Sequence, residues 1–196
     1  DHIFKTFDDR PNLFTKREVR VQILADLELP KNGVIWDIGA GCGSIGLEAL
    51  KLRPNLDLFC IDKRIGSKAL ILENSKRLGV KPKFIFEEDI HNVLNKTDSS
   101  SFEKPNRLVI GGCDKKTKLI IINKIAQSMI IGDIIVIPII DIQAIEVLRE
   151  ELEAKNFKTN LNLIQTYKSL SIAEGMRLEP NNLSLIHISE PTRQAT

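Results

Sequence analysis

The sequence is poor in the residues that form metal centres and disulfide frameworks. Among its 196 residues are three cysteines and three histidines. They are Cys42, Cys60, Cys113, His2, His91 and His187. Neither set has the spacing of a metal or redox motif, so we expect no metal site. An odd number of scattered cysteines is typical of proteins that are kept reduced, and we therefore expect a cytoplasmic location.

The sequence also lacks a strong charge of one sign and a long uncharged apolar run. Lysine and arginine number 28 against 26 acidic residues, a net charge of +2, which gives no reason to expect a nucleic-acid partner. The most apolar run, residues 130–140, contains Gly132, Asp133 and Pro138. It is predicted to be a buried strand, and we expect no membrane partner. A hydrophobic content of 42% suits one domain with a sizeable core.

What the sequence does contain is a regular alternation of strand and helix patterns. The predicted strands are residues 34–38, 56–61, 83–87, 107–110, 133–137, 159–168 and those from 176 onward. The predicted helices are residues 15–29, one ending near 52, 66–78, a short one after Asp89, 116–129 and 142–155. Thr15 is the predicted N-cap of the first helix. Five strand–helix units and a closing hairpin predict a doubly wound α/β sheet of seven strands, mostly parallel with one antiparallel strand.

Three glycines spaced two apart lie between the first predicted strand and the helix that follows it. They are Gly39, Gly41 and Gly43. Glycine allows a strand to turn sharply into a helix and allows the backbone to contact a ligand. Nineteen residues after Gly43, Asp62 follows the second predicted strand, where a carboxylate is placed to bind the hydroxyls of a ribose. The loop and the carboxylate together predict a site for a nucleoside cofactor.

The identity of that cofactor depends on Asp37. Residues 41–46 also fit the G-x-G-x-x-G dinucleotide pattern, so a nicotinamide-dependent oxidoreductase stays an alternative. Asp37, however, lies two residues before Gly39, where a carboxylate repels a pyrophosphate but not an amino-acid tail or a sulfonium. Asp-x-Gly-x-Gly-x-Gly resembles the first motif of class I methyltransferases, in which the acid lies near the methionine ammonium. We therefore expect a Rossmann-like class I methyltransferase fold with S-adenosylmethionine as cofactor, and Cys42 as a small residue of the loop.

Further motifs resemble one methyltransferase family in particular. The segments that carry the resemblance are Phe14-Thr15-Lys16-Arg17-Glu18-Val19-Arg20, Trp36 to Glu48, Val109-Ile110-Gly111-Gly112 and Ala173 to Asn182. They are similar to the precorrin methyltransferase/decarboxylase family of vitamin B12 biosynthesis, which occurs as a separate subunit or as the C-terminal half of a longer enzyme. The first and third segments lie outside the general methyltransferase pattern, so they carry the specificity of the match. The resemblance covers residues 1–182.

The resemblance implies roles for particular residues. The implied cofactor-binding residues are Thr15, Gly39, Ala40, Gly41, Cys42, Gly43, Asp62, Asp89 and Ile90. Within this set the loop holds the methionine portion, Asp62 the ribose, Asp89 and Ile90 the adenine, and Thr15 closes the pocket. The candidates for the substrate side are Lys16, Arg17, Arg20, Gly111, Gly112, Lys115 and Arg177. Arginine and lysine are included because a tetrapyrrole carries several carboxylates that need cationic partners.

The implied reaction is methylation of carbon-15 of a precorrin with loss of carbon dioxide from the acetate arm on carbon-12. No catalytic acid or base stands out in the sequence. The resemblance also implies a homo-oligomer, a tetramer, or fusion to a second methyltransferase domain. The alternatives are another class I methyltransferase that acts on a small molecule or RNA, and a binding domain that retains the pocket without activity.

Both ends of the sequence are unusual. The chain starts at Asp1 rather than at methionine, which suits a fragment of the fused form. Residues 183–196 do not resemble a natural ending and are similar to a translated sequencing adapter. We therefore expect the domain to end at residue 182 and assign no function to the tail.

Overall fold

The computed structural model describes residues 2–11, 14–97, 103–139 and 141–191. Within these residues seven strands form one sheet in the order β3-β2-β1-β4-β5-β7-β6. The strands are β1 (Gly33–Ile38), β2 (Leu56–Ile61), β3 (Phe84–Phe86), β4 (Arg107–Ile110), β5 (Ile134–Ile139), β6 (Phe157–Ile172) and β7 (Gly175–Pro191). The first five pair in parallel, and β7 runs antiparallel to both β5 and β6. This confirms the predicted mostly parallel sheet with one antiparallel strand.

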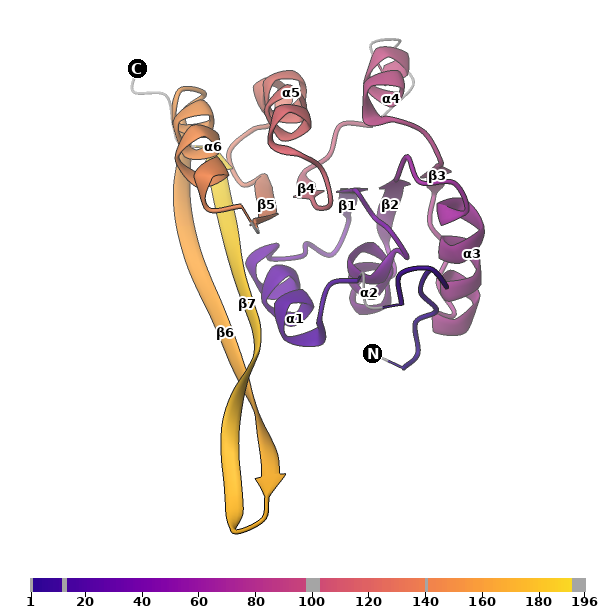
Figure 1. Ribbon diagram of the computed structural model, residues 1–196. Coiled ribbons are helices and arrows are strands. Elements are labelled where there is room, and N and C mark those ends of the chain that lie inside the picture. Colours follow the sequence, from indigo (N-terminus) through magenta and orange to yellow (C-terminus); the bar gives the residue numbers. More distant parts are fainter. Residues whose placement is uncertain (1, 12–13, 98–102, 140, 192–196) are drawn as a thin grey trace.

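Helices cover both faces of the sheet. They are α1 (Arg17–Asp26), α2 (Ser44–Leu52), α3 (Ser67–Leu78), α4 (Ile90–Thr97), α5 (Lys115–Ile125) and α6 (Gln143–Glu153), with a short 3₁₀ turn over Ala126–Ser128. Figure 1 shows α1, α2 and α3 on one face and α4, α5 and α6 on the other. This arrangement confirms the doubly wound α/β prediction. Among the described residues, no helix combines the length and apolar character needed to cross a bilayer.

The core has two parts, one on each face of the sheet. Along β1, Ile35 packs with the α1–α2 side, whereas Trp36 and Ile38 pack with the α4–α6 side. Successive side chains of a strand point to opposite faces, so a strand covered on both sides must be apolar throughout. This is why β1 appears in the sequence as an unbroken apolar run that stops only at Asp37.

Some element boundaries differ from the prediction. The N-cap of α1 is Lys16, not Thr15, and no side chain caps this helix. The prediction is off by one position, which is within the precision with which a sequence pattern locates a helix end. The Thr15 carbonyl accepts a hydrogen bond from the Arg20 guanidinium at 2.6 Å. Helix α5 ends at Ile125 rather than 129, and the 3₁₀ turn closes it. Strand β5 starts one residue later and ends two residues later than predicted, through Pro138 to Ile139.

The C-terminal hairpin is much longer than the sheet it joins. Only residues 185–189 of β7 pair with β5, whereas the pairing of β7 with β6 continues to the turn at Gly175. The remainder projects beyond the sheet as a two-stranded ribbon (Figure 1). Part of the sequence after residue 182 therefore pairs with β5, and residues 192–196 lie outside the described part. The domain end at residue 182 stays a prediction.

Candidate active site

The glycine loop leaves the carboxyl end of β1 and is tied to the end of β2. The main-chain N–H groups of Gly39 and Ala40 both donate to the Ile61 carbonyl, at 2.8 and 3.2 Å. Gly39, Gly41 and Gly43 have φ angles of 73°, 57° and 79°, which L side chains rarely adopt. A Cβ on Gly39 would also lie 2.7 Å from the Gly112 nitrogen. Glycine is thus required here by the backbone, as the spacing predicted.

Asp62 lies directly beside this loop. Its carboxylate accepts hydrogen bonds from the N–H groups of Gly41 at 2.7 Å and Arg64 at 2.8 Å. Asp62 is half-buried, and a Cβ built on Gly41 would meet no atom within 4 Å. The loop therefore borders open space next to a carboxylate that retains acceptor capacity. This cradle, the loop together with Asp62, is where a ligand with a ribose diol and a polar tail is predicted to bind.

Asp37 is buried beneath the loop, with 1% of its surface exposed. Its carboxylate accepts a hydrogen bond from the Gly46 N–H at 2.9 Å, which holds the first turn of α2 against β1. The pKa of Asp37 is raised to about 7, chiefly by burial; the Gly46 bond opposes the rise, and the negative charge of Asp62 adds to it. A Cβ on Gly46 would approach the Asp37 oxygen at 3.0 Å. The last glycine of the dinucleotide-like pattern is therefore explained by packing.

Asp89 and Ile90 lie at the start of α4, after the end of β3. The Asp89 carboxylate accepts a hydrogen bond from the His91 N–H at 2.9 Å, and its carbonyl accepts from Asn92 and Val93. Ile90 is 5% exposed and packs in the core with Trp36. Asp89 therefore offers a half-exposed side chain at the cofactor edge, whereas Ile90 offers only its main chain. Their contact with adenine stays a prediction.

Most of the chain is similar to a known protein family. Residues 6–184 match the family model described as "Precorrin methyltransferase domain". The chain belongs to the precorrin methyltransferase family. The family's methyl donor is S-adenosylmethionine, so the expectation of this cofactor rather than a nicotinamide is confirmed.

Individual members of the family are similar over different lengths. A precorrin-6Y C(5,15)-methyltransferase [decarboxylating] of Sinorhizobium sp is 33% identical over 98 residues, which are 50% of this chain but only 22% of that enzyme. A probable cobalt-precorrin-6B C(15)-methyltransferase (decarboxylating) of Pyrobaculum aerophilum is 28% identical, over 84% of this chain and 79% of that one. The crystal structure of a precorrin-6Y C5,15-methyltransferase from Geobacter metallireducens superposes with a TM-score of 0.82 at 25% identity, covering 98% of this chain and 96% of that one.

On the expected substrate side, Gly111 and Gly112 lie against the glycine loop. The Gly111 N–H donates to the Ile38 carbonyl at 2.7 Å, and a Cβ on Gly111 would lie 3.3 Å from the Gly39 carbonyl oxygen. Sequence reasoning missed Lys118, a buried side chain of α5 that donates to the Gly111 carbonyl at 2.5 Å. Burial lowers the pKa of Lys118. The sequence contains a signal for this burial, because position 118 lies on the same helical face as Ile121, Ile122 and Ile125.

The surroundings of Arg20 differ from those expected of a substrate contact. Its side chain is 2% exposed, and its Nε and Nη2 atoms each lie 3.0 Å from a carboxylate oxygen of Glu48. With the bond to the Thr15 carbonyl, this pairing fastens α1 to α2. The guanidinium therefore has partners within the chain and acts as a structural anchor, rather than as the free cation that a substrate carboxylate needs.

Among the other cationic candidates, Lys16 is half-buried, whereas Arg17, Lys115 and Arg177 are exposed. Lys16 lies with its Nζ 5.0 Å from the centre of the Phe14 ring, and the Arg17 side chain is 70% exposed. Arg177, by contrast, lies on the projecting ribbon and pairs with Glu179. It is eight residues before the first β7 residue that pairs with β5, which corresponds to about 26 Å of strand. Within one chain, the structure does not bring Arg177 together with Thr15 and the Gly111–Gly112 turn.

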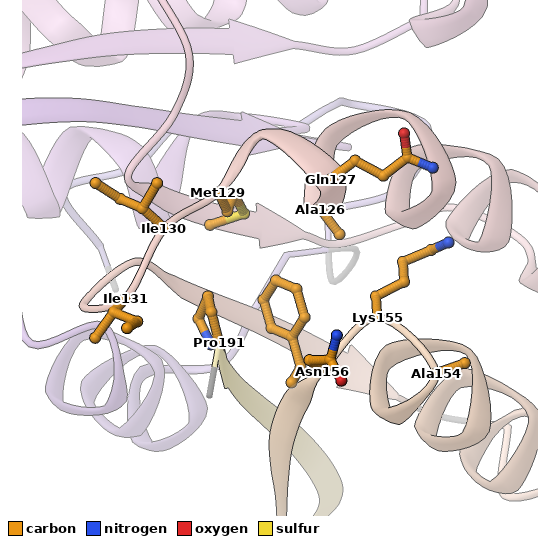
Figure 2. Close-up of a pocket in the computed structure, with 10 residues that line it drawn as sticks. Ala126, Gln127, Met129, Ile130, Ile131, Ala154, Lys155, Asn156 and Pro191 are labelled. Atoms are coloured by element: carbon orange, nitrogen blue, oxygen red, sulfur yellow. The ribbon is translucent and has the colours of Figure 1, made fainter. Parts of the chain in front are cut away.

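A pocket of about 620 Å³ lies elsewhere, at the ends of the strands opposite to the glycine loop. It is lined by the 3₁₀ turn after α5, the segment that leads into β5, the segment between α6 and β6, and the adjoining ends of β6 and β7, including Met129, Ile130, Lys155 and Asn156 (Figure 2). Ligands of doubly wound sheets bind at the carboxyl ends of the strands, where the glycine loop is. This pocket is therefore separate from the candidate active site.

Proposed function

We propose that this chain transfers a methyl group from S-adenosylmethionine to carbon-15 of a precorrin, with loss of carbon dioxide from the acetate arm on carbon-12. The observation that carries the proposal is the cradle of glycine loop and Asp62 in a chain matched by the precorrin methyltransferase family over residues 6–184. The matched relatives are named for methylation and decarboxylation of precorrins. The cradle supports the methyl-transfer half of the reaction, and the names support the choice of substrate.

The cofactor, when bound, supplies an electrophilic methyl group. In our proposal the main chain of residues 39–43 holds its methionine portion and Asp62 its ribose. Asp89 and the main chain of Ile90 border the adenine, and Thr15 closes the pocket from the start of α1. Because a pyrrolic carbon is already nucleophilic, the main task of the chain is alignment, which lowers barriers by about 7–11 kcal/mol in well-oriented reactions.

The substrate side of the proposal is the edge where β4 ends. Gly111 and Gly112 carry no side chains, so a flat macrocycle can approach the loop closely. The half-buried Lys16 and the exposed Arg17 and Lys115 are the cations that we propose as partners for substrate carboxylates, since a carboxylate loses much of its hydration on binding. Orienting the acetate arm while excluding water is the contribution expected from the chain to decarboxylation.

Assembly is a further part of the proposal. We infer that copies of this chain form a homo-oligomer, a tetramer by resemblance to the family, or that the ribbon packs on a fused methyltransferase domain. The support is a set of exposed apolar side chains on the ribbon. They are Leu161, Leu163, Leu170, Ile172, Met176 and Leu178, which are 41–74% exposed. An isolated two-stranded ribbon is marginal in water and gains stability when covered. A cytoplasmic location stays a prediction from cysteine usage.

The decisive assay incubates the protein with S-adenosylmethionine and either precorrin-6Y or its once-methylated product, each with and without cobalt, and follows mass. Gain of one methyl group with loss of carbon dioxide is the expected result. Methylation of transfer RNA or a small phenol, with every tetrapyrrole unchanged, would leave the class I fold but contradict the proposed substrate.

Asp62→Ala tests the cofactor site separately. Losing a charge-assisted hydrogen bond to the ribose should weaken binding of S-adenosylhomocysteine by about 1–3 kcal/mol. Titration calorimetry of the wild type and the variant measures it, with NAD as the control ligand. Unchanged affinity in the variant would mean that Asp62 stabilises the loop without binding the ribose. Tight NAD binding would contradict the cofactor assignment.

A further inference from the structure

Asn74 connects the N-terminal segment to the glycine loop. It lies on α3 with none of its surface exposed. Its Oδ1 accepts a hydrogen bond from the Lys5 N–H at 2.8 Å, and its Nδ2 donates to the Lys5 carbonyl at 2.9 Å. Nδ2 also donates to the Cys42 carbonyl at 2.9 Å. One buried amide therefore binds both main-chain groups of Lys5 and the centre of the loop.

The Cys42 carbonyl is a sensitive point of the loop. Cys42 lies between Gly41 and Gly43, which both have positive φ angles. Because glycine tolerates many backbone conformations, sterics alone do not fix the peptide groups around Cys42. Hydrogen bonds must hold them, and the bond from Asn74 is one of these. Loss of that bond would allow the loop to adopt other conformations at the place where the cofactor is proposed to bind.

The same N-terminal segment reaches the second element of the proposed cofactor site. The Phe7 ring packs on the Arg64 guanidinium at 3.8 Å from the ring centre, and Asp9 forms an ion pair with Arg64. The main-chain N–H of Arg64 in turn donates to Asp62 at 2.8 Å. Residues 3–9 thus contact the loop through Asn74 and the ribose carboxylate through Arg64.

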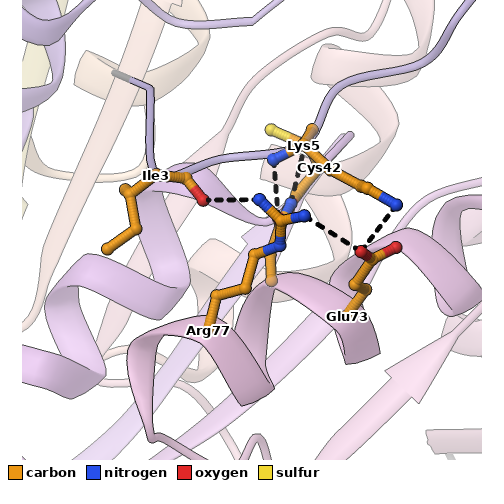
Figure 3. Close-up of polar contacts among 6 residues, drawn as sticks. Ile3, Lys5, Cys42, Glu73 and Arg77 are labelled. Atoms are coloured by element: carbon orange, nitrogen blue, oxygen red, sulfur yellow. Dashed lines mark hydrogen bonds and ion pairs between the residues drawn. The ribbon is translucent and has the colours of Figure 1, made fainter.

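Buried and exposed contacts of this segment differ in weight. Lys5 pairs with Glu73 at 2.7 Å, and Arg77 lies 3.5 Å from the Ile3 carbonyl oxygen (Figure 3), but these side chains are 39–52% exposed. Water screens such pairs, so they contribute little. Removing Asn74 instead leaves buried main-chain groups without partners, which is costly. The amide is therefore the main polar attachment of the segment, beside the apolar contact of the buried Phe4 ring with the core.

We propose that Asn74 is a positioning residue that makes docking of residues 3–9 and binding of S-adenosylmethionine dependent on each other. The inference rests on the proposed placement of the cofactor at the glycine loop and Asp62. A docked segment holds the loop in its binding conformation, and a bound cofactor, by holding the same loop conformation, retains the segment. Coupling between two binding events is reciprocal, so each must strengthen the other by the same factor.

The test compares Asn74→Ala with Arg77→Ala. Arg77 lies one turn away on the same helix and contacts the same segment through exposed groups, so it is the matched control. Affinity for S-adenosylhomocysteine is measured by calorimetry, docking of the segment by the rate of chymotrypsin cleavage after Phe7, and folding by thermal unfolding. In the wild type, S-adenosylhomocysteine should slow the cleavage at least fivefold. Asn74→Ala should lose at least tenfold in affinity and lose this protection, whereas Arg77→Ala should stay within twofold in affinity.

Lys5→Pro serves as the second variant in case Asn74→Ala does not fold. It removes the N–H that donates to Asn74 and leaves the bond to Cys42 in place, so we expect faster cleavage and a threefold to tenfold loss of affinity. A folded Asn74→Ala variant, or a Lys5→Pro variant with a released segment, that binds within twofold of the wild type would overturn the proposal. A wild type that binds S-adenosylhomocysteine and shows the coupling, but does not convert precorrin, contradicts only the proposed function.

Discussion

The region from β1 to α3, residues 33–78, and the hairpin of β6 and β7 use β-strands in opposite ways. β1 is covered on both faces, and the loop at its end is fixed by hydrogen bonds from Gly39 to Ile61 and from Gly41 to Asp62. The hairpin joins the sheet over a few residues and then projects with apolar side chains exposed. The first region finds its partners within the chain, whereas the ribbon lacks a cover. The proposed binding site is thus specified locally, whereas the proposed assembly surface would be specified only together with its partner.

Gly39→Ala should have the largest effect on cofactor binding, because it adds a side chain where the glycine loop packs against Gly112. The φ of 73° strains any L residue, and the new Cβ would lie 2.7 Å from the Gly112 nitrogen, which cannot move without displacing the end of β4. We expect loss of measurable S-adenosylhomocysteine binding in calorimetry. Gly132→Ala is the control, since its φ is 92° but no atom lies within 4 Å. It should lose only about 1–2 kcal/mol of stability and bind normally. Normal binding by Gly39→Ala would contradict the account of the loop.

Asp37 should make the stability of this region depend on pH. Its pKa is raised from an ordinary 3.8 to about 7, so the folded state holds a proton that the unfolded state releases between these values. The unfolding free energy should therefore fall as pH rises from about 4 to 7, by up to about 1.4 kcal/mol per pH unit, and level off above. In the Asp37→Asn variant, the amide oxygen keeps an acceptor for the Gly46 N–H, but the side chain does not titrate. Denaturant unfolding of the wild type and this variant across the same pH range checks the prediction, and parallel curves would refute the assignment.

The sequence revealed the loop because its signal is local. Positive φ at Gly39, Gly41 and Gly43 requires glycine whatever surrounds them, and Asp62 follows a strand whose end is visible as an apolar run. The roles of Arg20 and Asn74 were not predictable, because their partners lie 28 and 69 positions away in the sequence. The length of the ribbon was missed for a related reason: an alternating pattern predicts strand but not what the strand pairs with or how far it leaves the sheet.

Arg20 and Arg17 provide a matched pair on one helix. Arg20→Met removes a buried guanidinium bound to Glu48, and breaking such a pair costs about 3 kcal/mol, the lower end of the usual range because Glu48 is 27% exposed. Arg17→Met removes an exposed cation and should change stability by less than about 0.5 kcal/mol. Urea unfolding of the two variants measures the difference. Equal, small effects would show that the anchoring of α1 to α2 does not depend on the ion pair, and would reopen a substrate role for Arg20.

Substitutions in the ribbon should have the smallest effect on the stability of a single chain, but a clear effect on assembly. Met176 and Leu178 are 74% and 70% exposed, so replacing both with serine removes almost no burial within the chain and should alter its unfolding free energy by less than about 0.5 kcal/mol. If another copy covers the ribbon, the same change places polar hydroxyl groups in an apolar interface and weakens it. Light scattering should then report a lower mass than for the wild type. Ile65→Ser is the control, because Ile65 is 89% exposed but lies in the cofactor half of the molecule, and its mass should not change. An unchanged mass for the ribbon variant would remove these two side chains from the assembly surface and weaken the contrast between the two regions.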